Sequence, residues 1–191
     1  MSHYMPYDAY DKIHALALEQ HGVFSADQAR NLGVDKRSLV TMAARGHIER
    51  LAHGLYRDKK APETQWTPYM RAVLWPYRNP GVLSHETALA LMELSDVNPA
   101  AIHVSVPRGF RTLRKPPRGV VVHRADVPDT DVAPIEGLPT TIAARAIRDC
   151  ATENLGPALI RQAIADAQRK GWMVASEAES LMNDLIAAGK L

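Results

Sequence analysis

Two short stretches between residues 23 and 46 place apolar residues at the spacing of an α-helix. The first follows Ser25, and Gln28 three residues later completes an S-x-x-Q capping box, in which two backbone N–H groups are bonded reciprocally. Gly33 separates the two stretches, and Asp35 is placed to cap the second. The second helix has an apolar side of Leu39, Val40, Met42 and Ala43, and a polar, basic side without acids of Arg37, Ser38, Thr41, Ala44 and Arg45. Gly46 then ends this helix, because glycine adopts the left-handed conformation at little cost.

The segments on either side of these two helices complete a familiar arrangement. A longer helix is predicted before them, over residues 7–21, because apolar residues recur there at helical spacing and Gly22 follows. After them, residues 48–51 and 54–57 are predicted to be two short strands. Three helices followed by a β-ribbon are the layout of a winged helix-turn-helix, whose last helix enters the DNA major groove. The front of the chain is therefore predicted to bind DNA.

The remainder of the chain mixes helical and strand patterns. The segment from Lys59 to Thr64 combines charge with a proline and is predicted to be a linker, so the domains are expected to cover residues 1–61 and 62–191. Helices are predicted over residues 68–75, 84–94, 141–151, 155–170 and 176–188, and strands over residues 102–106 and 120–123. In the last helix, Ser176 is expected as the N-cap, and Leu181, Leu185 and Ile186 as the inward residues. The predicted fold class is α/β of the α+β type, mainly helical, with a winged helix-turn-helix followed by a mixed α/β domain.

Charge is distributed unevenly along the chain, although the net charge is only +2. Between residues 36 and 60 there are seven Lys or Arg against two Asp or Glu, whereas residues 125–191 contain six against ten. A basic front and an acidic rear indicate two surfaces with different partners. The lone Cys150 excludes an internal disulfide and fits a reducing compartment. The start of the sequence does not resemble a leader, and no run of about 20 apolar residues occurs, so the protein is expected to be cytoplasmic and away from membranes.

Basic and hydroxyl side chains of the second helix are the candidates for reading DNA bases. An arginine can donate two hydrogen bonds to guanine, and a threonine offers a hydroxyl or a methyl group. Basic residues on and after the β-ribbon would instead meet phosphates, which position a protein without specifying sequence. The predicted DNA-binding residues are Lys36, Arg37, Ser38, Thr41 and Arg45 on the helix and Arg50, Arg57, Lys59 and Lys60 on or after the ribbon. The competing interpretation is an ordinary solvated, charged surface.

A second basic run, residues 108–118, contains five Lys or Arg and no acid. It lies between two predicted strands and is therefore expected to form a hairpin-like loop. The sequence leaves three interpretations of this run open: an additional phosphate contact, a docking arm for an acidic partner, or a solvated loop, since loops are polar in general.

Neither a metal site nor another cofactor is expected. The S-H-E sequence at residues 84–86 lacks the H-E-x-x-H spacing that places two ligands on one helical face, and Cys150 has no cysteine partner at zinc-ligand spacing. Each histidine, including His47, His53, His103 and His123, is therefore expected to have a structural or surface role. Cys150 is expected to be a small buried residue.

The sequence also contains no motif of an enzyme active site, so no catalytic residue is expected. Clustered carboxylates at Asp126, Asp129 and Asp131 would be compatible with a metal-dependent nuclease. They fall, however, in the segment V-P-D-T-D-V-A-P, whose prolines predict a solvated loop. An enzyme is thus the least favoured class.

Several segments taken together resemble the AbiEi family of antitoxins. They are the winged-helix segment ending in H-G-L-Y-R (53–57), S-H-E-T-A-L-A-L (84–91), I-H-V-S-V-P (102–107), V-V-H-R-A-D (121–126) and G-L-P-T-T-I-A-A-R-A-I-R-D (137–149). Their order and spacing extend over nearly the whole chain. The resemblance implies a transcriptional regulator that represses its own operon and counters a co-encoded nucleotidyltransferase toxin. It also implies that the N-terminal domain binds operator DNA and the C-terminal domain provides antitoxicity.

The leading hypothesis is therefore a two-domain antitoxin and autorepressor. Its partners would be operator DNA, with dimerisation on DNA if the operator holds inverted repeats, and the co-encoded toxin, bound stably or transiently. One alternative is a repressor without a toxin, whose second domain oligomerises or senses an effector; a nucleotidyltransferase gene next to this one would argue against it. The other is the metal-dependent nuclease, which would cleave DNA as purified protein. The last two predicted helices are the first candidates for the toxin-facing surface.

Overall fold

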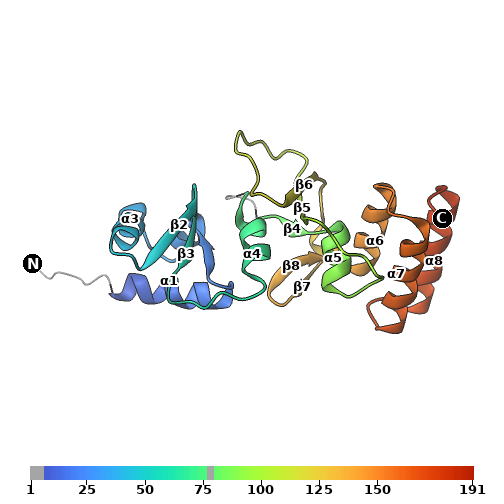
Figure 1. The fold of residues 1–191 in the computed structure, drawn as a ribbon, viewed down its shortest axis with the longest axis horizontal. Helices are drawn as coiled ribbons and strands as arrows, with labels where there is room; N and C mark the ends of the chain where they lie inside the picture. The colour runs from blue at the N-terminus through green and yellow to red at the C-terminus, as the bar shows by residue number, and fades with distance from the viewer. Residues whose placement is uncertain (1–6, 77–79) are drawn as a thin grey trace, which may run out of the picture. The chain divides into compact units, whose positions relative to one another are not determined.

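The computed structural model describes residues 7–76 and 80–191, and in them it contains eight α-helices and two β-sheets (Figure 1). The contacts divide the chain into two compact units. The first comprises Met1–Gly81 with Glu136–Leu138, and the second comprises Val82–Ile135 and Pro139–Leu191. The predicted fold class, a mixed α/β protein with a winged helix-turn-helix at its N-terminus, is confirmed.

The first unit contains the winged helix-turn-helix. Its elements in order are α1 (Tyr7–Glu19), β1 (Val23–Ser25), α2 (Ala26–Asn31), α3 (Lys36–Ala44), β2 (Ile48–Ala52), β3 (Leu55–Asp58) and α4 (Thr67–Leu74). The strands form an antiparallel sheet in the order β1-β3-β2. Strand β1 is absent from the sequence prediction because three residues are too few to show an alternating pattern. It joins the sheet with Phe24 opposite Tyr56, their ring centres 5.7 Å apart.

Local capping determines where α2 and α3 begin. Ser25 Oγ accepts the backbone N–H of Gln28 at 3.1 Å, and the Gln28 side-chain oxygen accepts the N–H of Ser25 at 2.8 Å, so the predicted capping box is confirmed. Asp35 Oδ1 accepts the N–H of Ser38 at 2.7 Å and caps α3, as predicted. These bonds satisfy N–H groups that the start of a helix otherwise leaves unpaired.

The buried face of α3 is narrower than the sequence pattern suggests. Leu39 and Met42 are part of the core of the first unit, and Ala43 packs against it. Val40, which was predicted on the same side, is 57% exposed. Because successive residues lie about 100° apart around a helix, a helix covered along one stripe leaves the neighbour of a buried residue in solvent. The prediction of Val40 as a core residue is wrong.

The segment predicted to be a linker packs against the first unit. Ala61 belongs to the hydrophobic core of this unit. The hydroxyl of Thr67, at the start of α4, donates to the backbone oxygen of His21 at 2.8 Å, and α4 contacts β1. Residues 59–64 therefore do not form a free linker, and the division by contacts falls at Gly81. The functional boundary after Ala61 stays a prediction.

The second unit is built on a five-stranded mixed sheet in the order β6-β5-β4-β8-β7. The strands are β4 (Val82–Leu83), β5 (Ile102–Val106), β6 (Val120–Arg124), β7 (Val132–Ile135) and β8 (Leu138–Thr141). β4 pairs antiparallel with β5 and parallel with β8, while β5 pairs parallel with β6. Strands β5 and β6 confirm the sequence prediction, whereas β4, β7 and β8 were not predicted.

A tight turn at Glu136-Gly137 joins β7 to β8 where the sequence suggests loops. Both turn residues have positive φ, 50° and 74°, which is the type I′ geometry of a two-residue hairpin. Glutamate is not among the residues that signal this turn, and Pro134 argues against a strand. A proline is tolerated here because β7 is an edge strand. The prediction of a solvated loop is therefore wrong for the residues of β7.

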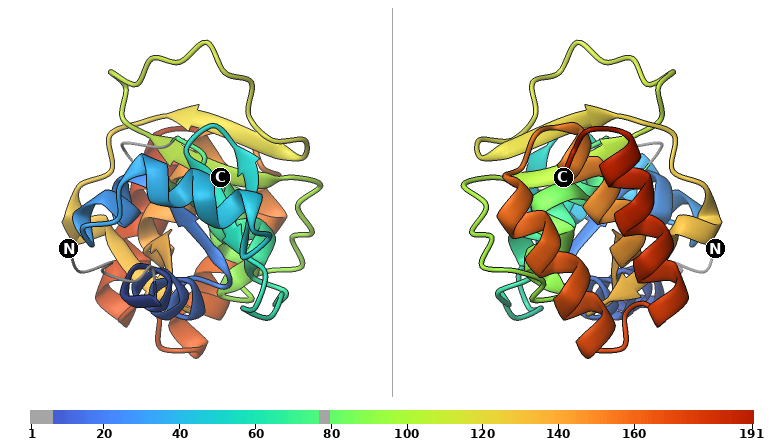
Figure 2. Two further views of the ribbon diagram at one scale, coloured as in Figure 1. Left: turned by 90° about the vertical axis from the view of Figure 1, so that its left-hand side faces the viewer. Right: turned by 90° about the vertical axis from the view of Figure 1, so that its right-hand side faces the viewer.

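Four helices complete the second unit: α5 (His85–Leu91), α6 (Ala143–Thr152), α7 (Pro157–Arg169) and α8 (Ala175–Ala187). α6 contacts α5, α7 and α8, and Figure 2 shows α7 and α8 side by side. Their apolar faces share one core, which includes Leu89, Ile147, Ile160 and Leu181. Among the described residues, no helix is both long and apolar enough to cross a membrane.

Helix α8 begins one residue before its predicted cap. Ser176 lies in its first turn, and Val174 precedes the helix, with its N–H bonded to Glu177 Oε2 at 3.1 Å. Leu185 is buried as predicted, whereas Ile186 is 54% exposed. Only one stripe of α8 meets the core, as in α3. Ser176 as the N-cap and Ile186 as a core residue are therefore wrong predictions.

The basic run does not form a hairpin. It connects β5 to β6, and because these strands are parallel the chain must return to the end at which β5 began. Such a crossover needs about a dozen residues or more, and residues 107–119 provide it. Figures 1 and 2 show this connection as a long loop that projects beside β6. At its base, the N–H of Arg108 donates to Asp126 Oδ1 at 3.0 Å.

Candidate nucleic-acid interface

Helix α3 presents the polar face that the sequence assigns to DNA. Lys36, Arg37, Thr41 and Arg45 are exposed, and Ser38 is partly exposed. Arg37, Thr41 and Arg45 follow one another at intervals of four residues, so they form one stripe along the helix. The hydroxyl of Thr41 donates to the backbone oxygen of Arg37 at 3.0 Å, and its oxygen can still accept a hydrogen bond.

Helix α3 lies between two hollows in the surface of the first unit. One hollow, of about 510 Å³, is lined by Tyr10, Asp35, Arg37, Ser38, Thr41, Met42, Arg45, His47 and Lys60. The other, of about 520 Å³, is lined by residues of α2, of α3 and of the wing, which is the hairpin of β2 and β3. Among them are Arg30, Lys36, Arg50 and His53. A helix with open space on both sides has the shape required to enter the major groove, where the two phosphate backbones flank it.

Most of the predicted DNA-binding residues line these two hollows. Arg37, Ser38, Thr41, Arg45 and Lys60 line the first, and Lys36 and Arg50 line the second. Lys59 is exposed after β3. The side chain of Arg57 is only 19% exposed, and its Nε lies 3.2 Å from Glu63 Oε1, so it would have to give up this ion pair to reach a phosphate. The individual contacts to DNA stay predictions.

Three further residues at this surface were not foreseen from the sequence: Tyr10, Arg30 and His47. The rings of Tyr10 and His47 lie 5.2 Å apart, and Lys60 Nζ lies 5.2 Å from the centre of the Tyr10 ring. Tyr10 belongs to α1, far from α3 in the sequence, so only the packing of α1 against the wing brings it here. Of the three, only Arg30 could have been predicted from the sequence, because it is a basic residue of α2 and so of the helix-turn-helix itself.

A buried carboxylate lies behind the first hollow. Asp58 in β3 is fully buried, and its Oδ1 accepts hydrogen bonds from the Tyr10 hydroxyl at 2.8 Å and the Lys60 N–H at 3.0 Å. A short contact with His14 Nδ1 completes its surroundings. Burial and the Asp58 carboxylate raise the pKa of Tyr10, so the phenol keeps its proton and donates it. Asp58 therefore ties α1 to β3 and fixes the backbone at Lys60.

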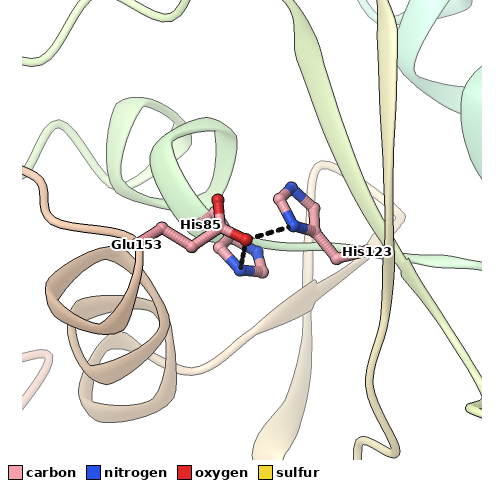
Figure 3. A group of neighbouring side chains, drawn as sticks. All are labelled: His85, His123 and Glu153. Carbon is pink, nitrogen blue, oxygen red and sulfur yellow. Dashed lines mark hydrogen bonds and ion pairs between the residues drawn. The ribbon is translucent and has the colours of Figure 1, made fainter.

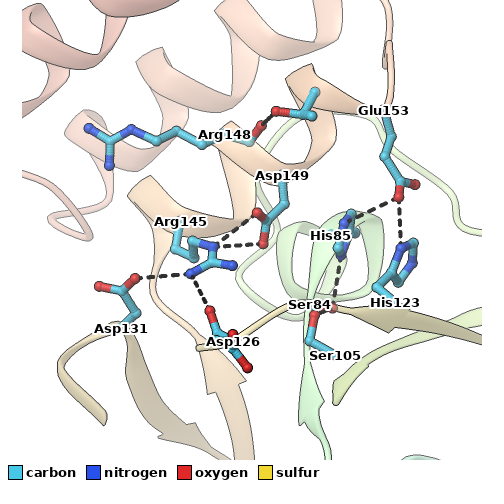
Figure 4. A network of polar contacts seen from close by, with 11 residues as sticks. Ser84, His85, Ser105, His123, Asp126, Asp131, Arg145, Arg148, Asp149 and Glu153 are labelled. Carbon is cyan, nitrogen blue, oxygen red and sulfur yellow. Dashed lines mark hydrogen bonds and ion pairs between the residues drawn. The ribbon is translucent and has the colours of Figure 1, made fainter. Parts of the chain in front are cut away.

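One of the acids considered for a nuclease, Asp131, is paired with an arginine in the second unit (Figure 4). Arg145 Nε donates to both carboxylate oxygens of Asp149, at 2.9 and 3.0 Å. Arg145 Nη1 donates to Asp131 Oδ2 at 3.3 Å and to the backbone oxygen of Asp126 at 3.4 Å, while Asp129 is exposed. Burial raises the pKa of Asp149 although Arg145 opposes the shift. The guanidinium of Arg145 thus pairs with the carboxylates of Asp131 and Asp149, and the arrangement does not favour the nuclease hypothesis.

Three histidines that are distant in the sequence lie together in the second unit. The ring centres of His85 and His123 are 3.6 Å apart, those of His103 and His123 5.1 Å, and those of His85 and His103 6.1 Å. Glu153 contacts two of these rings. The pairing of β5 with β6 brings His103 close to His123, and α5 adds His85. No spacing motif connects these histidines in the sequence, so their proximity could not be predicted from it.

Cys150 is buried in α6, as predicted. Burial, with nearby carboxylates, raises the pKa of its thiol well above the ordinary value. Because the thiolate is the reactive form, this cysteine is an unreactive part of the core.

Comparison with known proteins supports the expected family for the front of the chain. Residues 11–57 match the family model described as transcriptional regulator, AbiEi antitoxin. The matched segment runs from within α1 to β3 and therefore includes α2, α3 and both strands of the wing. The resembling segments between residues 84 and 149 lie outside it. Comparison with curated proteins gives no match.

A solved structure shares the fold of most of the chain. The crystal structure of the RV2827C protein from Mycobacterium tuberculosis superposes with a TM-score of 0.52, over 92% of this chain and 71% of that chain. The two sequences are 16% identical, so the similarity concerns the fold.

Proposed function

We propose that this protein is an autorepressor and antitoxin, which binds its own promoter through α3 and counters a co-encoded nucleotidyltransferase toxin through its second unit. The observation that supports DNA binding most directly is the exposed basic stripe of α3 between two hollows. The match of residues 11–57 to the AbiEi antitoxin regulators supports the same assignment, because it includes the whole helix-turn-helix and the wing.

In this proposal α3 lies in the major groove. Arg37 and Arg45, at the two ends of the stripe, donate to guanine edges, and Thr41 between them contacts a neighbouring base. Arg50 and Lys60, one in each hollow, meet the phosphates on either side, which fixes the position of the helix in the groove. Lys36, Ser38 and Lys59 add phosphate contacts near these two.

Promoter binding by the full chain tests this proposal. We expect Arg37→Ala or Arg45→Ala to weaken binding to the promoter by about 1–3 kcal/mol, and to weaken binding to unrelated DNA much less, because a base contact is sequence-specific. The measurement is fluorescence anisotropy at several salt concentrations. Arg161→Ala, which removes an exposed arginine of α7, is the matched control and should leave binding unchanged. If the α3 variants bind both the promoter and unrelated DNA as tightly as the wild type does, α3 is not the recognition helix.

Exposed apolar side chains lie on and between the C-terminal helices of the second unit. Trp172 and Val174, between α7 and α8, and Ile186 in α8 are exposed apolar side chains. Tryptophan is enriched among residues that dominate protein interfaces. We therefore propose that α7 and α8 face the toxin, and that Trp172→Ala abolishes protection of cells from it.

A repressor without a toxin remains the alternative, and its second unit would serve oligomerisation or effector sensing. Co-expression with the product of the neighbouring gene separates the two: growth rescue that Trp172→Ala removes supports the antitoxin, whereas a chain that never rescues growth supports the stand-alone repressor.

A further inference from the structure

Two histidines and a glutamate from three elements of the second unit meet at one point (Figure 3). His85 is the first residue of α5, His123 lies in β6, and Glu153 follows the last turn of α6. Glu153 Oε1 lies 2.8 Å from His123 Nδ1 and 3.6 Å from His85 Nε2. Within the described part of the chain, these are the residues whose ligand atoms gather closely enough to hold a metal ion, all within 4.8 Å of one another.

The spacing of these three atoms fits a small tetrahedral ion. With Zn–N and Zn–O bonds of about 2.0–2.2 Å, neighbouring ligand atoms in a tetrahedral zinc site lie about 3.3–3.5 Å apart. The two distances to Glu153 Oε1 lie on either side of this value. The third pair, His85 Nε2 and His123 Nδ1, lies within 4.8 Å. Because the two rings are stacked, with 15° between their planes, binding of an ion requires one ring to turn until both nitrogens face it.

Both imidazoles already have the second partner that a metal-bound histidine needs. His85 Nδ1 lies 2.9 Å from Ser84 Oγ, which is in turn bonded to Ser105 Oγ at 2.8 Å. His123 Nε2 lies 2.9 Å from His103 Nδ1. Metal-bound histidines donate their second ring N–H to such a group, which fixes the tautomer and the orientation of the ring. Here Ser84 and His103 would accept these protons, and Figure 4 shows the serines behind His85.

The surroundings enclose His85 and leave one side of the cluster open. His85 is 5% exposed, so its ring is held within the second unit and not in solvent. The side chain of Glu153 is 51% exposed, which leaves an approach from solvent. The nearby Arg145 is neutralised by Asp149 and Asp131.

The backbone at His85 is also unusual. Its φ is +53°, a conformation that a side chain other than glycine rarely adopts and that tends to occur at functional sites. Ser84 and His85 are both buried, so this geometry aims the imidazole into the cluster rather than into solvent.

We propose that His85, His123 and Glu153 form a binding site for a divalent transition-metal ion of the Zn²⁺ class, with water in the fourth position. The bound ion joins the start of α5, strand β6 and the end of α6. His103 is a positioning residue, because it contacts His123 and not the ion. The site belongs to the second unit and α3 to the first, and none of the residues proposed to bind DNA belongs to it. It also replaces the expectation from sequence that the histidines have separate structural roles.

Zinc titration of the metal-stripped full chain tests the site. We expect one Zn²⁺ per chain by calorimetry, with a higher melting temperature once zinc is bound, because a ligand that binds only the folded state stabilises it. Glu153→Gln and His123→Asn should weaken binding by more than about a hundredfold. His103→Phe should weaken it by about ten- to a hundredfold, as is usual when a residue that hydrogen-bonds a metal-bound histidine is replaced. Glu179→Gln in α8 and His53→Asn in the wing are the matched controls and should bind as the wild type does.

Co²⁺ provides a readout that needs no substitution. A tetrahedral site with nitrogen and oxygen ligands gives strong visible d–d bands without the near-ultraviolet band of a thiolate, which separates it from binding at Cys150. Weak octahedral bands, a thiolate band, absence of stoichiometric Zn²⁺ binding, or unchanged binding in both Glu153→Gln and His123→Asn would each overturn the proposal. Circular dichroism shows whether the variants are folded. If a variant is unfolded, the Co²⁺ spectrum of the wild type tests the proposal in its place.

Discussion

Among single residues of the first unit, Asp58 is a fully buried carboxylate that contacts more than one element. Its carboxylate is withdrawn from water, accepts hydrogen bonds from Tyr10 and the backbone of Lys60, and contacts His14. A buried charge is tolerated only when it is paired and hydrogen-bonded. One side chain thus joins α1 to β3 and at the same time shapes the hollow beside α3.

Replacing Asp58 should therefore lower the stability of the first unit. We expect Asp58→Ala to lower the free energy of unfolding by about 1–3 kcal/mol, because the Tyr10 hydroxyl and the Lys60 N–H lose their hydrogen-bond acceptor. Urea unfolding followed at the amide resonances of α1 and β3 measures the effect. Asp8→Ala, which breaks the exposed pair with Lys12, is the control and should cost about 0.3–0.5 kcal/mol. Equal effects of the two substitutions would show that the buried network contributes little.

Asp166 provides a test of pH dependence in the second unit. Hydrogen bonds from Arg169 and from the N–H of Ser95 lower its pKa below the ordinary value of 3.8. A carboxyl whose pKa is lower in the folded state stabilises it above the unfolded value, and this contribution is lost as the pH falls through the folded pKa. We expect the stability advantage of the wild type over Asp166→Asn to be full at neutral pH and to shrink from about pH 4 downward.

Acid titration of thermal stability measures this difference. Asp184→Asn removes an exposed carboxylate of α8 that pairs with Arg148, and it serves as the control. An advantage of the wild type over Asp166→Asn that stays constant down to about pH 2 would contradict the proposed role of Asp166.

At the scale of elements, α3 combines a one-sided attachment to the core with an open outer face. Leu39 is buried and its neighbour Val40 lines the hollow toward the wing. A helix that enters the DNA groove must keep most of its surface free. Only a few residues of α3 can therefore pack against the core. The caps at Asp35 and Gly46 then fix the two ends without help from the core.

Adjacent residues of α3 should therefore respond very differently to truncation. We expect Leu39→Ala to lower the free energy of unfolding by about 2–5 kcal/mol, because it leaves a cavity in the core. Val40→Ala should change it by no more than about 0.5 kcal/mol, as for other surface substitutions. Urea unfolding of the two variants decides the matter, and each serves as the control of the other. A large cost for Val40→Ala would restore the broader core that the sequence pattern suggested.

At the scale of the whole molecule, the two units differ in charge and in the surfaces that they expose. The basic surplus lies in the winged helix-turn-helix, and the acidic surplus lies late in the chain. Each unit also has its own hydrophobic core. Both features support separate partners for the two units, operator DNA for the first and the toxin for the second.

The two proposed activities should therefore be separable in the full chain. We expect Arg37→Ala combined with Arg45→Ala to abolish repression of the promoter while cells remain protected from the toxin. A promoter-reporter assay and growth after toxin induction measure the two activities in the same strain. Arg37→Lys with Arg45→Lys retains the charge without the bidentate hydrogen bonding of arginine. Compared with the double alanine variant, it should regain sequence-independent DNA binding but little repression. A folded, abundant alanine variant that fails to protect would show that both activities share one surface.

The helix-turn-helix and the exposed basic face of α3 could be predicted from the sequence. The capping box at Ser25, the cap at Asp35 and the basic stripe of α3 depend on residues within a few positions of one another, and local patterns record such relations directly. Seven of the nine predicted DNA-binding residues line the two hollows beside α3, because the wing follows α3 immediately in the chain.

Contacts between distant segments were decided only by the tertiary structure. The sheet order made residues 107–119 a crossover instead of a hairpin, and it recruited β7 and β8 from a stretch with proline signals. Packing exposed Val40 and enclosed Ala61, since burial depends on what covers a residue as well as on its spacing. The pairing of β5 with β6, with α5 and α6 beside them, gathered His85, His123 and Glu153. No short-range pattern encodes that meeting, because each residue comes from a different element and the elements meet only when the second unit folds.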